Sequence, residues 1–333
     1  LGNWLMLEMW MLNYADQGIA DQYHFIKALE VRFGEKETER LMDIYRTNWI
    51  QGSDFDIIKS FGMNTVRLPF DYKLLMDSDE KPFRLKDDAW EWLDKAIAMA
   101  KKREMFVILD MHGAPGRQSG MDHSGRVGYN KLWSNKNHQK QTVWLWNQIS
   151  QRYRKEPAVA AYDLLNEPVL PWGYGPQALR NIYEWVIDSI RTVDPNHVVI
   201  IEGNWYGNDH TGLLPPFDDE MVYSFHHYVG GSTDTTTMYN QYRTGISLEY
   251  NVPLWVGEFG ENSNYWGSNI KSFFERNDIG WKGIKHHFDL DLNGVLNKTY
   301  PNIIFTDDEL EEGKLFLNKF TTDYKGIVCL SLK

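Results

Sequence analysis

Two segments of the chain present a carboxylate where an apolar strand should end. The stretch YDLLNEPV is apolar at first, then presents Asn166 and Glu167, and stops at Pro168. The stretch PLWVGEFG is similar, because its apolar run ends at Glu258. Burying an ionised carboxylate without a partner costs several kcal/mol. Each glutamate therefore needs a chemical or structural reason.

Two glutamates that face each other across one site are what glycoside hydrolysis requires. One carboxyl holds a proton for the departing oxygen, while the other, ionised, attacks or directs water at the anomeric carbon. Asn166 could hydrogen-bond a sugar hydroxyl, Arg67 could keep Glu258 ionised, and Tyr228 offers another donor. Taken singly, Glu167 and Glu258 could instead be salt-bridge or helix-capping residues.

Short apolar runs that read as strands must position these side chains. Several are apolar almost throughout, as strands covered on both faces are. The expected strands are 3–9, 65–70, 105–112, 159–166, 197–204, 221–228 and 253–260. Segments of helical period lie between them, at 54–62, 88–103, 138–154, 176–193 and 236–250. Strand followed by helix, repeated, predicts a parallel sheet.

Polar residues favour a closed barrel over an open sheet. All seven expected strands carry polar chemistry at their C-terminal ends, at Glu8, Arg67, His112, Asn166 with Glu167, Glu202 with Asn204, His226 to Tyr228, and Glu258. A β/α barrel brings all such ends to one rim, whereas an open sheet gathers them mainly at its switch point. No glycine-rich phosphate motif follows the early strands. We therefore expect one (β/α)8 TIM barrel over residues 1–333.

Composition limits the ligands and partners. The 333 residues carry a formal net charge of −11 and no basic run, which argues against nucleic acid or an anionic membrane surface. One cysteine excludes an intrachain disulfide and metal sites built from several thiolates. No apolar stretch is long enough to span a membrane, and no signal peptide is visible. We expect a monomer without a cofactor, and localisation stays open.

Five motifs in chain order resemble glycoside hydrolase family 5, the clan of retaining β-glycosidases on β/α barrels. They are NTVRLP, DMHG, LLNEP, FHHY and WVGEFG. The stretches LGNWLMLEMWM, DQYHF, NWIQGSDFDIIKSFGMNTVRLP and DMHGAPGRQSGMDHSG are similar to the exo-β-1,3-glucanase group of that family. The resemblance covers roughly residues 1–282, and residues 283–333 depart from it.

The resemblance implies a role for each matching position. Glu167 would be the acid/base and Glu258 the nucleophile of a two-step reaction through a covalent glycosyl–enzyme intermediate, with net retention. The implied substrate is a β-glucan or an oligosaccharide. The implied sugar-binding residues are Glu8, Arg67, His112, Asp122, Asn166, His226, Tyr228 and Trp281. The His-x-Tyr spacing of the family selects His226 over His227.

Two positions depart from the family pattern. The stretch IGWKGIKHH begins as expected at Gly280 and Trp281, but the second Trp that forms the floor of the sugar site is absent. Met121 stands where the exo-glucanase group has an aromatic clamp. The ending GIVCLSLK reads as a strand, and a last helix is expected around 307–320. An altered eighth strand is therefore part of the prediction.

Other functions stay open on the sequence alone. An endo-β-1,4-glucanase or mannanase could use the same catalytic core, and a catalytically weak carbohydrate-binding barrel would fit the altered eighth strand. A metal hydrolase would need His112, Asp122, His123, His226 and His227 to converge, and no compact ligand spacing supports that.

Overall fold

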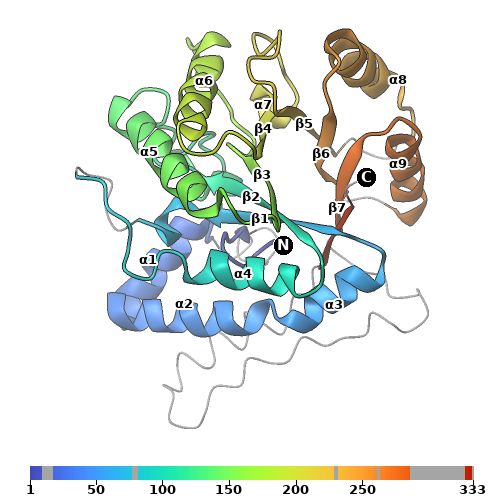
Figure 1. Ribbon diagram of the computed structural model, residues 1–333. Coiled ribbons are helices and arrows are strands. Elements are labelled where there is room, and N and C mark those ends of the chain that lie inside the picture. Colours follow the sequence, from blue (N-terminus) through green and yellow to red (C-terminus); the bar gives the residue numbers. More distant parts are fainter. Residues whose placement is uncertain (10–17, 77–81, 229–231, 261–262, 286–326, 332–333) are drawn as a thin grey trace.

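Seven parallel strands form one curved sheet in which neighbours in space are neighbours in sequence. The computed structural model describes residues 1–9, 18–76, 82–228, 232–260, 263–285 and 327–331. The strands are β1 (Thr65–Asp71), β2 (Phe106–Gly113), β3 (Val159–Asp163), β4 (Val198–Glu202), β5 (Met221–His227), β6 (Leu254–Phe259) and β7 (Gly280–Lys285). Figure 1 shows them curling around a common centre, with helices on the outside. This arrangement brings all seven C-terminal ends to one rim.

Helices cover the outer face of the sheet. They are α1 (Gln22–Phe33), α2 (Glu35–Trp49), α3 (Gly52–Ser60), α4 (Glu91–Lys101), α5 (Lys136–Tyr153), α6 (Gln177–Arg191), α8 (Thr236–Met238) and α9 (Asn264–Arg276). The short segment α7 (Asn204–Gly207) follows β4 at the rim and contains two residues with left-handed backbone. In the part of the chain that the structure describes, three short or unusual helices accompany them, η3 (Tyr72–Leu74), η4 (Asp122–Ser124) and the π-helix η5 (Tyr239–Leu248). Within the described ranges, none of the helices has the length and apolar content needed to cross a bilayer.

Helix α6 illustrates why the sequence forms these elements. Six apolar or aromatic residues recur at intervals of three or four positions, so they share one face of the helix. They are Leu179, Ile182, Tyr183, Val186, Ile187 and Ile190, and all are buried.

The expected strands and the five expected helices are present with shifted ends, except for the first strand. Sequence periodicity did not indicate α1, α2 and α9.

The strand expected at residues 3–9 is wrong. In this segment only Leu5 makes an isolated parallel bridge, to Phe70 of β1. Asn3 has a φ of 53°, in the left-handed region, and its side-chain oxygen accepts a hydrogen bond from the backbone N–H of Glu8 at 2.7 Å. An asparagine side chain that bonds nearby backbone favours a turn over a strand. The segment turns instead of extending.

The C-terminal end of the sheet also differs from a barrel of eight parallel strands. Strand β8 (Ile327–Ser331) pairs with β7 in the antiparallel direction, with Gly283 opposite Cys329. The stretch GIVCLSLK thus forms a strand, as its apolar pattern predicts. The helix expected at 307–320 and the pair His286 and His287 lie outside the described residues.

Candidate active site

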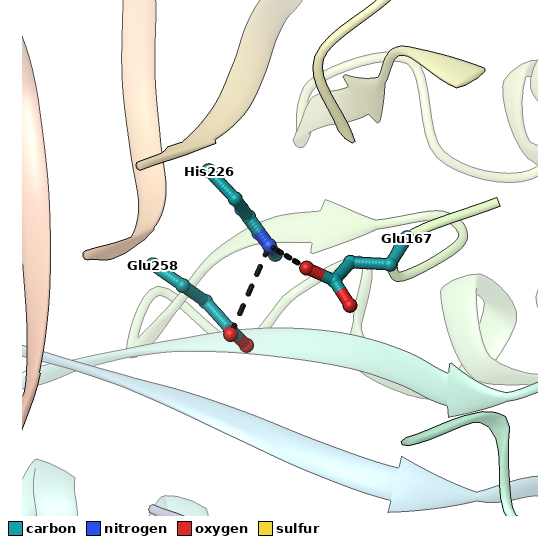
Figure 2. A group of neighbouring side chains, drawn as sticks. All are labelled: Glu167, His226 and Glu258. Atoms are coloured by element: carbon teal, nitrogen blue, oxygen red, sulfur yellow. Dashed lines mark hydrogen bonds and ion pairs between the residues drawn. The ribbon is translucent and has the colours of Figure 1, made fainter. Parts of the chain in front are cut away.

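Glu167 and Glu258 lie close together at the C-terminal rim of the sheet. One oxygen of each carboxylate and one ring nitrogen of His226 all lie within 4.8 Å of one another (Figure 2). The Nδ1 atom of His226 is 2.7 Å from Oε1 of Glu167 and 3.8 Å from Oε2 of Glu258. All three residues are buried. The imidazole therefore bridges the two carboxylates.

The local backbone explains how each glutamate reaches this position. Glu167 follows β3 and has a φ of 43°, a left-handed conformation that is uncommon for a residue with a side chain. Glu258 lies in β6, where the pairing with β5 shifts by one residue so that His226 is opposite Glu258. A Cβ atom on Gly257 would lie 2.7 Å from Nε2 of His226. Glycine at 257 therefore gives the imidazole its space.

Arg67 of β1 joins four carboxylates in the centre of the sheet. Its Nη1 atom is 2.8 Å from Glu258 and 3.0 Å from Asp110, its Nε atom is 2.7 Å from Asp163, and its Nη2 atom is 3.0 Å from Glu202. The Arg67 side chain is fully buried. Burial alone would lower the pKa of the guanidinium, but the surrounding carboxylates raise it well above its usual value. Arg67 is thus a fixed positive charge that faces Glu258.

Asn166 and His112 form a second group of contacts beside Glu167. The side-chain oxygen of Asn166 accepts a hydrogen bond from Arg67 at 3.0 Å, and its Nδ2 atom is 3.3 Å from Nε2 of His112. His112 also contacts Asp110 at 2.8 Å and Glu8 at 3.4 Å. Burial lowers the pKa of His112, but these two carboxylates outweigh it and raise the pKa to about 10. The structure therefore brings Glu8, His112 and Asn166 together.

Tyr228 reaches the other oxygen of Glu258. Its hydroxyl donates a hydrogen bond to Oε2 at 2.6 Å. Burial, followed by the nearby carboxylates, raises the pKa of Tyr228 well above its usual value, so the hydroxyl keeps its proton. Glu258 is thus held at one oxygen by Arg67 and at the other by Tyr228.

Opposing effects act on the ionisation of Glu167. Burial raises its pKa, the interaction with His123 and the hydrogen bond and charge of His226 lower it, and the charge of Glu258 raises it; the net direction is down. For His226, burial lowers the pKa, and the charges of Glu202 and Glu258 raise it well above the usual value. Nδ1 of His123 lies 3.4 Å from Oε2 of Glu167. The proton affinity of Glu167 therefore depends directly on the charge of its neighbours.

Two candidates from the sequence stand apart from this group. Asp122 begins η4, but the described ion pair from this segment to Glu167 comes from its neighbour His123. Trp281 of β7 is buried against Phe259, with ring centroids 5.7 Å apart, and Lys271 of α9 lies 5.8 Å from its ring. These contacts turn Trp281 toward the outer helix layer. Its assignment as a sugar-binding residue gains no support from its position.

Four members of the site were not among the expected site residues. Asp110 and Asp163, which the sequence did not single out, contact Arg67. Glu202, expected only as a polar strand end, contacts three site residues, and His123, considered only as a metal ligand, contacts Glu167. A signal was present, because Asp110 and Asp163 interrupt apolar strands, where an ionised side chain requires a partner. The sequence places these acids in the core, but it does not say which cation they meet.

A cation could in principle use the two glutamates and His226, because these are the described residues whose ligand atoms cluster. The contacts favour a different arrangement. His226 holds a proton between the carboxylates, and its raised pKa opposes loss of that proton. A metal ion needs a deprotonated imidazole. Binding of a cation would therefore have to displace a proton that the surrounding carboxylates stabilise.

His227, the neighbour of His226, points to the other face of β5 and leads to a prediction on pH. It stacks on Trp266 with ring centroids 5.6 Å apart, and burial lowers its pKa to about 4. An unfolded histidine titrates near pH 6.5, so the unfolded state takes up a proton first as pH falls from about 6.5 to 4. The fold is therefore most stable, with respect to His227, above pH 6.5, and it loses this part of its unfolding free energy as the pH falls toward 4.

We expect His227→Phe to remove that loss while keeping the stacked ring. The difference in unfolding free energy between wild type and variant should move by roughly 3 kcal/mol in favour of the variant between pH 7 and pH 4. Urea unfolding at a series of pH values measures it. A difference that stays constant over this range would contradict the expectation.

Comparison with known proteins places these observations in context. Residues 31–285 match the family described as Cellulase (glycosyl hydrolase family 5). A protein named Beta-xylosidase from Phanerodontia chrysosporium is 31% identical over 68% of this chain and 47% of its own length. One named Probable glucan 1,3-beta-glucosidase A from Aspergillus fumigatus is 28% identical over 76% of this chain and 58% of its own. The chain thus spans about half the length of these relatives.

Solved structures share the fold. The endoglucanase Cel5A of Thermotoga maritima aligns with a TM-score of 0.57 at 22% identity, over 70% of this chain and 81% of its own. The rutinosidase of Aspergillus niger aligns with a TM-score of 0.64 at 19% identity, over 83% of this chain and 84% of its own. At these identities the likeness concerns the fold alone.

Proposed function

Because the chain belongs to glycosyl hydrolase family 5, we propose that it hydrolyses β-glycosidic bonds by double displacement with net retention. Glu258 is the nucleophile and Glu167 the acid/base in this proposal. The observation that supports this proposal is the distance between the two carboxylates, because one oxygen of Glu167 and one of Glu258 lie within 4.8 Å of each other. Retaining enzymes hold their two carboxyl groups about 5 to 5.5 Å apart, whereas inverting enzymes need about 6.5 to 9.5 Å to admit a water molecule.

The first step forms a bond between Glu258 and the anomeric carbon. The bond from that carbon to the leaving oxygen breaks, and the proton of Glu167 moves to this oxygen. Arg67 and Tyr228 contact the two oxygens of Glu258, so they keep it ionised and fix its direction of attack. In the second step water attacks the same carbon, its proton passes to Glu167, and Glu258 is released.

Glu167 must be an acid in the first step and a base in the second. As a carboxylate, Glu258 raises the pKa of Glu167, while His123 and His226 lower it. Once Glu258 is esterified to the sugar, its charge is gone, so the pKa of Glu167 falls at the stage where a base is needed. Loss of the Glu258 charge thus favours the base form of Glu167 in the second step, whereas in the first step Glu167 must hold a proton against the net downward shift of its pKa.

The proposed substrate is a β-glucan with terminal β-1,3-linked glucosyl residues. Several relatives are named glucan 1,3-beta-glucosidase, and the sequence motifs resemble the exo-glucanase group. Glu8 lies beside His112, where it could bind hydroxyls of a terminal glucose.

We further propose that the seven parallel strands are the main part of a (β/α)8 barrel and that the protein acts as a monomer.

A product profile tests this function. We propose incubation of the intact protein with laminarin, cello-oligosaccharides, mannan and aryl β-glucosides, with products identified by chromatography. Glucose released from laminarin supports exo action on β-1,3-glucan, whereas longer products from cello-oligosaccharides or mannan would indicate an endo-acting enzyme. Ligand binding without turnover of any of them would instead identify a carbohydrate-binding barrel.

An exposed tryptophan next to the site leads to a prediction on substrate length. Trp205 and Tyr206 follow β4, both with left-handed φ values of 57° and 60°, and Trp205 is 62% exposed. Tyr206 lies edge-on to His123, which contacts Glu167. Strained residues of this kind often belong to functional sites. We propose that Trp205 contacts the leaving-group side of a sugar chain.

We expect Trp205→Ala to raise KM for laminari-oligosaccharides roughly 3- to 10-fold, because ring stacking is worth about 0.5 to 1.5 kcal/mol. The KM for a short aryl β-glucoside should change much less. Tyr265→Ala, which removes an exposed ring on α9, serves as the control and should change neither value. An equal rise for both substrates would contradict a role on the leaving-group side.

A further inference from the structure

Glu202, the last residue of β4, holds a central place among the buried side chains of the rim. Its Oε2 atom accepts a hydrogen bond from the backbone N–H of Glu167 at 2.7 Å. Its Oε1 atom accepts from Arg67 at 3.0 Å and lies 3.2 Å from Nε2 of His226. The Glu202 side chain is fully buried. One carboxylate thus contacts the backbone of the proposed acid/base and two of its neighbours.

The position of Glu202 is itself fixed by α6 and by the loop after β4. The hydroxyl of Tyr183 donates to the carbonyl of Glu202 at 2.9 Å and accepts from its N–H at 3.2 Å. A Cβ atom on Gly207 would lie 3.1 Å from Oε2 of Glu202, and Gly207 has a φ of 79°. Glycine there lets the loop pass close to the carboxylate, which therefore has a defined orientation.

The contact with Glu167 matters because of the backbone conformation there. The φ of 43° at Glu167 is unfavourable for a residue with a side chain and persists only when surrounding contacts hold it. The charge-assisted bond from its N–H to Glu202 is such a contact. Glu202 also faces Nε2 of His226, whose Nδ1 atom contacts the Glu167 carboxylate. Glu167 is thus held at its backbone and, through His226, at its carboxylate.

We propose that Glu202 is a positioning residue that orients Glu167 for proton transfer to the leaving group and from water. This rests on the proposed function, because it assumes that Glu167 is the acid/base. Glu202 acts through the N–H of Glu167 and through the His226 imidazole. Glu202 also contacts Arg67, and Arg67 contacts Glu258. Glu202 would have a different role if it acted mainly as a counter-charge for Arg67, and the two roles predict different kinetics.

The dependence of kcat/KM on the leaving group distinguishes the two roles of Glu202. A dinitrophenolate leaves without protonation, whereas a phenolate of higher pKa needs a proton from Glu167. A defect in proton transfer therefore lowers kcat/KM for poor leaving groups and spares good ones. A defect in the nucleophile lowers both, because bond formation by Glu258 occurs in each case. Azide adds a further readout, since it attacks the glycosyl–enzyme intermediate without needing a base.

The test is Glu202→Gln, assayed on a series of aryl β-glucosides. Glutamine keeps the shape but offers one acceptor oxygen, so it cannot accept from both Glu167 and Arg67, and its amide N–H groups face donors. We expect kcat/KM for phenyl β-glucoside to fall on the order of 10²-fold, with less than about threefold change for the 2,4-dinitrophenyl substrate. Azide should restore kcat on the latter and yield the β-glucosyl azide.

Two further variants complete the experiment. Glu202→Asp keeps the charge and should recover part of the loss on phenyl β-glucoside. Asp194→Asn alters another buried carboxylate, which accepts from Tyr162 away from the rim, and should lower thermal stability without changing leaving-group dependence. An equal loss on all aryl glucosides in Glu202→Gln or Glu202→Asp, without azide rescue, would overturn the positioning role. A wild type without turnover would overturn the proposed function and this inference together.

Discussion

Replacement of Glu258 by Gln is expected to lower kcat/KM on every β-glycoside substrate on the order of 10⁴-fold or more. Removal of a nucleophile from a covalent mechanism abolishes the intermediate, and losses of this size or larger are measured for such residues. The amide is neutral and cannot attack the anomeric carbon. Glutamine nearly preserves the side-chain volume between Arg67 and Tyr228, so ligand binding should remain. A carbohydrate-binding barrel would bind ligand equally well before and after the replacement and would show turnover in neither protein.

Stereochemistry makes this prediction specific to the assigned roles. In a Glu258→Gly variant, azide could enter the vacated space and attack an activated glucoside directly, which gives the α-glucosyl azide by one inversion. In a Glu167→Ala variant, azide attacks the intermediate on Glu258, and two inversions give the β-glucosyl azide. Product analysis by NMR distinguishes them. The β product from the Glu258→Gly variant would show that the roles of the glutamates are reversed or that Glu258 is not the nucleophile.

Replacement of Arg67 by Met is expected to lower the free energy of unfolding at pH 7 by about 3 to 5 kcal/mol, because it leaves buried carboxylates without their cation. Arg67 pairs with Asp110, Asp163, Glu202 and Glu258, and its side chain is fully buried. Urea unfolding measures the change. Arg40→Met removes an exposed pair with Glu37 within α2 and should cost less than about 0.5 kcal/mol.

The pH dependence of this effect has a defined sign. Even beside Arg67, burial raises the pKa of Asp163 to about 8, and nearby acids add to the rise. Without the guanidinium, the buried carboxyls should have folded-state pKa values raised above those of the unfolded chain. Such groups stabilise the fold below the unfolded pKa and lose that contribution as pH rises. The deficit of Arg67→Met should therefore shrink from pH 7 to pH 4.5, and a deficit that grows would contradict this account.

The sequence by itself carried the main features of the site. Glu167 and Glu258 could be found because each ends an apolar strand, and parallel strands bring such ends to one edge. Apolar runs marked β1 to β6, while the strand at Gly280 was expected from the family pattern alone. The motifs around Arg67, His112 and Tyr228 pointed to the family that the comparison then showed. These signals are local, since each depends on a few neighbouring residues. Local turn chemistry at Asn3 overrode the apolar pattern of the first expected strand.

Only the tertiary structure decided which partners the buried charges have. Arg67 and Glu258 are 191 positions apart, and Arg67 and Asp163 are 96 apart, so their contact depends on the curvature and register of the whole sheet. The same holds for the bond from the N–H of Glu167 to Glu202, and for the outward packing of Trp281. A buried acid must meet a cation or a donor, which the sequence can state. The identity of that partner depends on the curvature and register of strands that are far apart in the sequence.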